Sequence, residues 1–256
     1  QGARADGGDG GLFGDAGGTG VSERGMVPIS DAGYRHGVGV FETVRVQNGK
    51  APWREWHLES IRESAKVLGL KVEERELAKN PDGDGIWRWF VTETGTRTWW
   101  SEGIELPPAA YELDLAETGV WSTSWEARYK TLSYLNRIQA KREGGKPDEE
   151  RVMLNERGEI ASASMANLFW VRDGKLRTPS RECGCRAGTV RRWLLERSGQ
   201  RVEEGRWKLE ELNGAEEIFL TNARIGIKSV QAWKGRKLAG PKLAADLAKR
   251  FWKESS

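Results

Sequence analysis

The apolar and polar residues of the first hundred positions are spaced as in a small sheet with one helix packed on it. Residues 38–46 alternate as a half-buried strand does, and the Asn48-Gly49 pair after them is typical of a tight hairpin turn. Residues 53–69 place apolar side chains at helical spacing. Residues 86–92 and 96–100 carry the pattern of a further strand pair. These elements predict an α+β lobe.

The second half of the chain mixes strands and helices. Its pattern predicts strands at 120–125, 152–154, 167–172, 175–178 and 217–221, and helices at 135–142, 189–198 and 243–253. Residues 101–119 have few periodic signals and include Pro107-Pro108, so a joint between two lobes is expected there.

These patterns define a domain plan for an α+β or α/β chain. An N-terminal lobe is expected at residues 26–105 and a C-terminal lobe at residues 120–256. Residues 1–25 contain ten glycines and almost no apolar residues, so we expect a flexible leader there.

Composition narrows the class of protein. The 41 basic and 38 acidic residues of the 256-residue chain leave a net charge of +3, which is not the concentrated positive field of a nucleic-acid binder. No apolar run approaches the roughly 20 residues that span a bilayer. Cys183 and Cys185 are too close to form a useful disulfide. We therefore expect a soluble cytoplasmic protein that binds neither nucleic acid nor membrane.

The chain has only two histidines, His36 and His57, which excludes a three-histidine metal site. We expect no metal ion. Lys130 lies between a predicted strand and a predicted helix, next to Arg128, where burial and like charge would favour a neutral amine for Schiff-base chemistry. A surface lysine at a helix start is the alternative that local context leaves open.

Two further segments could bind a phosphate. Residues 188–190 open the predicted helix at 189–198, and free N–H groups at a helix start attract anions. Residues 221–223 follow a predicted strand with small polar side chains. Each signal is weak alone, because most helix starts after glycine bind only water.

Several motifs, in order, resemble the class IV aminotransferases, also called fold-type IV pyridoxal-phosphate enzymes. This family includes branched-chain and D-amino-acid aminotransferases and aminodeoxychorismate lyase. The matching blocks are Asp31-Ala32-Gly33-Tyr34, Val40-Phe41-Glu42-Thr43-Val44-Arg45-Val46, His57-Leu58, Lys130-Thr131-Leu132-Ser133-Tyr134-Leu135, Leu154-Asn155-Glu156-Arg157-Gly158, Ala166-Asn167-Leu168-Phe169, Ala187-Gly188-Thr189-Val190-Arg191 and Phe219-Leu220-Thr221-Asn222.

The resemblance implies two lobes with pyridoxal 5'-phosphate between them, an amino-acid-like small-molecule substrate and a homodimer. Lys130 matches the lysine, at the cleft between the two lobes, that binds the cofactor and later moves the substrate's Cα proton. Other cofactor contacts are implied at Tyr134, Gly188, Thr189, Val190, Thr221 and Asn222. Substrate contacts are implied at Tyr34, at His36 and at Arg97, whose guanidinium would suit a substrate carboxylate.

Two residues at cofactor positions depart from the family pattern. Ser60 stands where the family usually has an arginine that binds the cofactor phosphate. Losing that ion pair weakens the binding free energy of the cofactor by about 1.5–3 kcal/mol unless Arg62, Arg191 or another cation substitutes. Ser162 stands where a glutamate usually keeps the pyridine nitrogen protonated. Serine can only hydrogen-bond a largely neutral ring, which weakens the ring as an electron sink.

These departures leave three hypotheses. A weaker electron sink favours elimination, so a lyase resembling aminodeoxychorismate lyase, which forms 4-aminobenzoate and pyruvate, is slightly preferred. An aminotransferase of the branched-chain or D-amino-acid type is the second. A non-catalytic relative that has lost the cofactor is the third.

Overall fold

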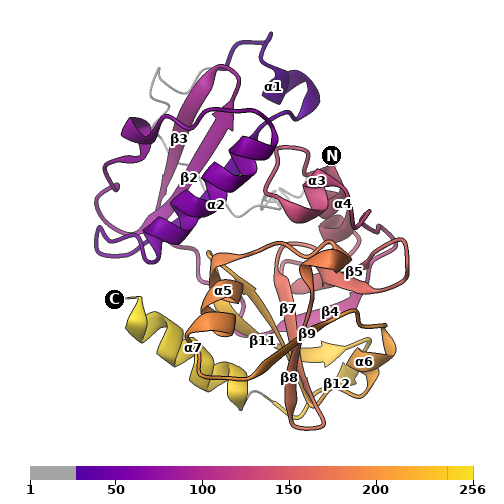
Figure 1. Ribbon diagram of the computed structural model, residues 1–256. Helices are drawn as coiled ribbons and strands as arrows, with labels where there is room; N and C mark the ends of the chain where they lie inside the picture. Colours follow the sequence, from indigo (N-terminus) through magenta and orange to yellow (C-terminus); the bar gives the residue numbers. More distant parts are fainter. Residues whose placement is uncertain (1–26, 241, 256) are drawn as a thin grey trace, which may run out of the picture.

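The computed structural model of the protein describes residues 27–240 and 242–255. Figure 1 shows two lobes, a small sheet crossed by one long helix and a larger sheet flanked by helices. The glycine-rich leader expected at residues 1–25 lies outside the described residues. None of the helices in the described ranges is long and apolar enough to cross a membrane.

The N-terminal lobe confirms the predicted strands and helix. An antiparallel sheet of order β1-β2-β3 packs against α2. The elements are α1 (Ala32–His36), β1 (Val40–Val46), α2 (Arg54–Val67), η2 (Glu74–Leu77), β2 (Gly85–Thr92) and β3 (Gly95–Glu102). Every second residue of β1 is buried, and Val40 and Val44 pack with Leu58 and Ile61 of α2. Alternation in the strand and helical spacing in α2 thus bury one common apolar face.

The C-terminal lobe is built on a nine-stranded mixed sheet of order β6-β5-β4-β11-β10-β7-β8-β9, with β12 paired to β11. Its strands are β4 (Tyr111–Leu115), β5 (Glu149–Leu154), β6 (Ile160–Ala163), β7 (Asn167–Arg172), β8 (Lys175–Pro179), β9 (Val202–Gly205), β10 (Glu217–Asn222), β11 (Gly226–Trp233) and β12 (Arg236–Lys237). Its helices are α3 (Trp125–Arg128), α4 (Leu135–Arg142), η3 (Arg181–Cys183), α5 (Thr189–Glu196), α6 (Glu210–Asn213) and α7 (Leu243–Glu254).

Helices α5 and α7 cover the same region of the large sheet (Figure 1). Trp193 of α5 and Phe251 of α7 pack in one apolar cluster with Phe169 and Phe219 of the sheet. Trp53, at the start of α2, packs against the same cluster. The N-terminal lobe is therefore anchored to the C-terminal lobe close to the beginning of α5.

Two predictions about the middle of the chain are wrong. Residues 111–115, expected in the joint, form β4, a strand parallel to both β5 and β11. Residues 120–125 do not form a strand: Val120 makes only an isolated bridge to Asn155, and a turn leads into α3. The Ser124 hydroxyl donates to the Trp121 carbonyl in that turn, a local bond that competes with strand pairing. The large lobe thus begins by Tyr111 rather than at residue 120.

A short stretch after α3 joins the lobes at the site. Thr131 forms an antiparallel bridge with Val40 at the start of β1. The amide of Phe41 donates to the Lys130 carbonyl at 2.8 Å, and the amide of Leu132 donates to the Gly39 carbonyl at 2.8 Å. Lys130 is therefore held by backbone bonds at the boundary of the two lobes.

Candidate active site

Lys130 projects from this boundary toward β1. Its side chain is 21% exposed, and Nζ donates to Glu42 Oε2 at 2.7 Å. Arg128, the neighbour expected to act on the lysine, donates its Nε–H to the Ser122 carbonyl at 2.8 Å. The charged group in contact with the lysine is thus a carboxylate from the other lobe, so the prediction that a like charge from Arg128 acts on Lys130 is wrong.

Glu42 is the centre of a buried hydrogen-bond network. Its carboxylate is 1% exposed and accepts from the Thr43 amide, from the Ser60 hydroxyl at 2.6 Å and from Lys130. His57 Nδ1 lies 3.1 Å from Glu42 Oε2, and because a carboxylate only accepts, Nδ1 carries the proton. Burial alone would raise the pKa of Glu42, but Lys130 and His57 hold it well below the usual range. Glu42 is therefore a permanent anion that fixes the lysine amine.

The start of α5 lies at the other end of this network. Thr189 Oγ1 is 3.3 Å from His57 Nδ1. Contacts through Glu42 and His57 thus link the Lys130 amine to the first residue of α5. Gly188 precedes the helix and makes no side-chain cap, so the first N–H groups of α5 are available to an anion.

A pocket opens beside the start of α5. It is lined by Arg45, His57, Thr189, Val190 and Ala223, with aromatic walls from Trp53, Phe251 and Trp252. Arg45 lies on β1, where its guanidinium stacks 4.3 Å from the centre of the Trp252 ring and Nη1 donates to the Arg224 carbonyl at 3.0 Å. This arginine brings a positive charge to the pocket from an element that the sequence did not single out.

The three residues considered for the lost phosphate contact lie elsewhere or serve other partners. Ser60 donates to Glu42. Arg62 forms an exposed pair with Glu74 at 2.7 Å. Arg191 donates to the Pro179 carbonyl at 3.0 Å and pairs with Glu204. Neither Arg62 nor Arg191 lines the pocket at the start of α5.

Thr221 and Asn222 end β10 close to that pocket, since the next residue, Ala223, lines it. The Thr221 hydroxyl is buried without a partner among the described residues, so it is free to bind a ligand. The side chain of Asn222 is already used: its amide donates to the Met165 carbonyl, and its oxygen accepts from the amides of Arg224 and Ile225. Asn222 can therefore offer a ligand only its backbone.

Ser162 lies on β6 with its hydroxyl bound by an arginine. Arg137 of α4 donates Nη1 to Ser162 Oγ at 3.0 Å, and both side chains are buried. Burial and the neighbouring Arg186 lower the pKa of Arg137 to about 9, which still leaves the guanidinium charged at neutral pH. At the position where the family usually has a glutamate, this chain therefore has a serine whose hydroxyl oxygen is bound by a charged arginine.

Tyr134 lies among three cations. The guanidinium carbon of Arg186 is 4.7 Å from the centre of the Tyr134 ring. Burial raises the pKa of the Tyr134 phenol, but the nearby charges of Arg186, Arg137 and Lys130 lower it overall. The lysine and the Arg137–Ser162 pair thus share one cation-rich cleft.

The expected substrate residues lie further out. Tyr34 is 69% exposed on α1, and His36 is exposed at the end of the same helix. Arg97 of β3 pairs in register with Phe90, which in turn pairs with Phe41. The Cα atom of Arg97 is therefore about 10 Å from that of Phe41, the residue whose amide binds the Lys130 carbonyl. Within the described residues of one chain, neither Tyr34 nor His36 lines the pocket at the start of α5. Their substrate roles stay predictions.

These residues fit pyridoxal phosphate. Lys130 offers an amine to the aldehyde, the start of α5 with Arg45 and the unpartnered Thr221 hydroxyl offers donors to the phosphate, and Ser162 offers a hydroxyl to the ring nitrogen. The Lys130 amine and Thr189 Oγ1 are no further apart than three successive contacts of 2.7, 3.1 and 3.3 Å allow. A pyridine ring with its phosphate arm can bridge that span.

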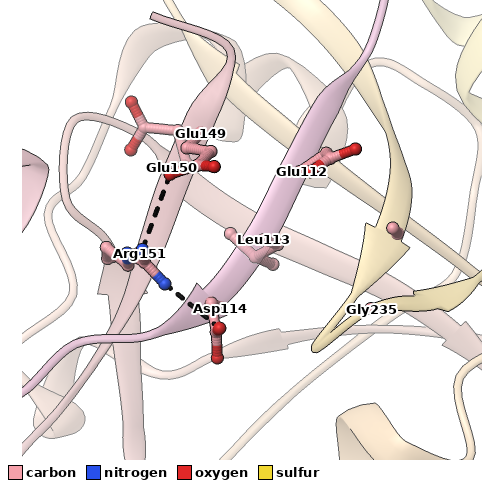
Figure 2. A pocket seen from close by; sticks show the side chains of 8 residues that line it. Glu112, Leu113, Asp114, Glu149, Glu150, Arg151 and Gly235 are labelled. Carbon is pink, nitrogen blue, oxygen red and sulfur yellow. Dashed lines mark ion pairs between the residues drawn. The ribbon is translucent and has the colours of Figure 1, made fainter. Parts of the chain in front are cut away.

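A second hollow lies away from this cleft, between β4, β5 and the turn after β11 (Figure 2). Glu149, Asp114 and Arg151 line it, and Arg151 pairs with both carboxylates, at 3.6 and 3.2 Å. None of the residues predicted for the active site lines it. Asp114 is paired across neighbouring strands, Glu149 along its own strand, and Glu150 with Lys141 of α4.

Sequence reasoning did not select three residues that shape the cleft: Glu42, Arg45 and Arg137. Glu42 carried a usable signal, because it falls on the buried side of an alternating strand, where a charge needs a partner. Arg45 falls on the opposite side of the same strand. Arg137 carried no clear signal, since its partner Ser162 lies 25 residues away on another element.

Known proteins are similar to this chain in sequence. Residues 100–233 match the model of the family described as amino-transferase class IV. Aminodeoxychorismate lyase of Bacillus subtilis (strain 168) is 30% identical over 229 residues, which cover 77% of this chain and 78% of that protein. D-alanine aminotransferase of Listeria monocytogenes is 27% identical over a 267-position alignment, which covers 91% of this chain and 92% of that protein.

Solved structures share the fold. A branched-chain aminotransferase from Thermoproteus uzoniensis, crystallised with norvaline, superposes with a TM-score of 0.79 at 24% identity and covers 90% of each chain. A second branched-chain amino acid aminotransferase, solved with pyridoxamine 5'-phosphate, gives 0.75 at 19% identity and covers 91% of this chain and 90% of that chain. The chain belongs to the class IV aminotransferase family of lyases and aminotransferases, and it has the two-lobed fold-type IV architecture of these pyridoxal-phosphate-dependent enzymes.

Proposed function

We propose that this protein binds pyridoxal 5'-phosphate through Lys130 and acts as a lyase of the aminodeoxychorismate lyase type. The reaction removes pyruvate from 4-amino-4-deoxychorismate and leaves 4-aminobenzoate. The observation that carries the proposal is the Lys130 amine, fixed by Glu42 at the boundary of the lobes and linked through His57 to the start of α5.

Pyridoxal phosphate, when bound, supplies an electron-withdrawing ring next to the substrate's Cα. Lys130 then serves as the group that takes the Cα proton, since its Nζ is the amine in the cleft. Glu42 does not carry this proton, because against the effect of burial Lys130 and His57 keep its pKa well below the usual range. Its role is to orient Nζ. The start of α5 and Arg45 hold the phosphate and so fix the distance to Lys130.

Two observations favour a lyase over an aminotransferase. Ser162 provides no carboxylate to protonate the ring nitrogen, so the ring is a weaker electron sink and a substrate with a good leaving group is favoured. The cleft also concentrates Lys130, Arg137 and Arg186 around Tyr134, which suits a substrate with two carboxylates better than a branched-chain amino acid. The similarity to the Bacillus subtilis lyase agrees with this preference.

Lys130→Ala tests the proposal. Wild-type protein incubated with pyridoxal phosphate is expected to gain a visible absorbance band, and borohydride reduction is expected to attach the cofactor to the peptide containing Lys130. The variant should lose both signals. A protein without either signal would instead be a non-catalytic relative. Release of pyruvate and 4-aminobenzoate supports the lyase, whereas keto-acid-dependent amino transfer without pyruvate release supports an aminotransferase of the branched-chain or D-amino-acid type.

We also propose a cytoplasmic homodimer. Several large apolar side chains near the cleft are exposed in the single chain: Tyr34, Val38, Trp121, Trp125 and Leu135. Exposed apolar groups at this density mark an interaction surface, and a second copy would cover them. Both cysteines are buried and free, as suits a reducing compartment. Sedimentation analysis should give twice the chain mass, and Trp125→Glu should shift the protein toward the monomer.

A further inference from the structure

We propose that Arg137 is a positioning residue that, through Ser162, keeps the ring nitrogen of bound pyridoxal phosphate unprotonated. The inference rests on the proposed function, because it requires that the cofactor binds with its ring nitrogen toward Ser162. It goes further by assigning a role to a buried arginine that lies behind the ring site.

The hydrogen-bond directions of this pair follow from chemistry. Arg137 Nη1 lies 3.0 Å from Ser162 Oγ, and it also approaches the carbonyls of Ala163 and Ser164 at 3.3 Å. A guanidinium can only donate, so the Ser162 oxygen is the acceptor. The serine's own hydroxyl proton is then free for another acceptor, and an unprotonated ring nitrogen facing Ser162 can accept it.

The charge around Ser162 acts in the same direction. Arg137 is 4% exposed, and its Nη2 has no hydrogen-bond partner among the described residues. An unpartnered buried donor of this kind is costly unless a ligand satisfies it. A proton on the ring nitrogen would place a second positive charge beside this guanidinium in a site with little water. Like charges at short range disfavour the protonated form.

No nearby carboxylate among the described residues reverses this effect. Glu150 is the carboxylate whose charge raises the pKa of Arg137. Its carboxylate is already engaged by Lys141 at 3.2 Å, by the Ser164 hydroxyl and by the Met165 amide. The Arg137–Ser162 pair thus presents a positive field to the ring nitrogen, where the usual glutamate of this family presents a negative one.

The polarity of this pair has a consequence for the reaction. An unprotonated ring withdraws less charge from the substrate's Cα, so reactions in which a leaving group removes that charge are favoured over those that store it on the ring. Ser162→Glu alone is not expected to restore a protonated ring, because the new carboxylate would pair with Arg137. Restoration requires that the arginine be replaced as well.

The test measures the ring nitrogen directly. Wild-type protein is loaded with pyridoxal phosphate carrying ¹⁵N in the ring, and the ¹⁵N chemical shift is followed against pH. Wild type should show the shift of an unprotonated pyridine throughout the range near neutrality. Arg137→Gln keeps donors for the carbonyls but removes the charge, and the pH at which its ring nitrogen titrates should rise by about one unit or more.

Two further variants separate charge from structure. Arg137→Lys retains the charge and should retain the unprotonated shift. Arg177→Gln removes another largely buried arginine, whose guanidinium pairs with Glu203 of β9 and Glu211 of α6, and should leave the ¹⁵N titration unchanged. Ser162→Glu combined with Arg137→Gln should give the shift of a protonated ring.

The outcomes distinguish the two proposals. Wild-type protein that gains no visible band with pyridoxal phosphate overturns the proposed function, and this inference with it. A visible band with a protonated ring nitrogen in wild type overturns only the role of Arg137, and so does an identical titration in wild type and Arg137→Gln. A protonated ring nitrogen in wild type would overturn the role of Arg137 even if the Arg137 variants fail to fold.

Discussion

Ser60 donates its hydroxyl to Glu42 Oε1 at 2.6 Å, while Lys130 donates to the other oxygen of the same carboxylate. The residue that stands in place of the usual phosphate arginine is therefore part of the network that holds the lysine. An arginine at position 60 would bring a second strong cation to Glu42 and compete with Lys130 for it. The serine keeps the carboxylate directed at Lys130, and the proposed function assigns the phosphate to other groups.

Glu42→Gln should lower kcat about tenfold to a hundredfold while the cofactor stays bound. The amide carries no charge to pair with the Lys130 ammonium, and its N–H group faces side chains that themselves donate hydrogen bonds. Steady-state kinetics and the cofactor absorbance of the same sample check this. Glu217→Gln is the matched control: Glu217 is also buried, but it accepts from the amides of Leu243 and Ala244, so its loss should affect stability and leave kcat unchanged. Wild-type kcat in Glu42→Gln would show that the carboxylate does not orient the lysine.

The elements that the sequence predicted correctly are those whose pattern is complete within a short stretch of chain. Helix α4 was predicted at its observed bounds, 135–142, and β7 at 167–172, because their patterns are local and clear turns flank them. Strand β4 was missed although its five residues alternate between apolar and polar side chains, because it is short, follows a proline pair closely, and has partners, β5 and β11, that are distant in sequence. Strand β11 was missed for a related reason: its residues alternate poorly, and pairing with β10 and β4 stabilises it.

The candidate site also contains residues that the sequence could predict and residues that it could not. Lys130 and the start of α5 could be placed because each is marked by a motif, and the structure links them through His57. The cations at Arg45 and Arg137 could not be placed, because their roles arise only when distant elements meet. No spacing in the sequence shows that α4 delivers its arginine to Ser162.

Arg45→Gln should weaken the affinity for pyridoxal phosphate about tenfold or more, because a charge-assisted bond to the phosphate is worth about 1.5–3 kcal/mol. Fluorescence titration of the cofactor-free protein measures this affinity. Pyridoxal, which lacks the phosphate, should bind both proteins equally. Arg62→Gln removes an exposed arginine paired with Glu74 and should leave both affinities unchanged. Equal affinity of wild type and Arg45→Gln for the phosphate form would exclude Arg45 as the phosphate cation.

The stability of the protein in acid should depend on Asp31. Its buried carboxylate begins α1 and accepts from the Gly33 amide, the Tyr34 amide, and the Thr92 and Thr94 hydroxyls. Burial raises the pKa of Asp31, but these hydrogen bonds lower it overall. A lowered pKa in the folded state stabilises the protein above the unfolded value of about 3.9, and this contribution is lost as the pH falls below it.

Urea unfolding between neutral pH and about pH 3 tests this expectation. Asp31→Asn should lower the free energy of unfolding by about 1–3 kcal/mol at neutral pH, since buried donors lose a charged acceptor. It should also lose less stability than wild type as the pH is lowered through about 4. Asp82→Asn alters an exposed aspartate in a turn and should follow wild type. Parallel curves for wild type and Asp31→Asn would mean that Asp31 contributes nothing to the acid dependence.

Gly188→Ala should disturb the start of α5 by a steric route. A Cβ at position 188 would lie 2.3 Å from Asn167 Oδ1, and Asn167 cannot move freely because its amide donates to the Arg186 carbonyl at 2.9 Å. The backbone at 188 has a negative φ, so alanine itself is tolerated there and only the contact is at fault. We expect a loss of about 1–3 kcal/mol in the free energy of unfolding and weaker binding of pyridoxal phosphate.

The matched test uses Asn167→Ala, which removes the obstructing oxygen. In that background Gly188→Ala should cost clearly less than in wild type, giving a coupling between the two positions in a double-mutant cycle. Both the free energy of unfolding and the affinity for pyridoxal phosphate should show the coupling, because the start of α5 is the structure that both depend on. Equal costs in the two backgrounds would show that the glycine is required for a reason other than the approach of Asn167.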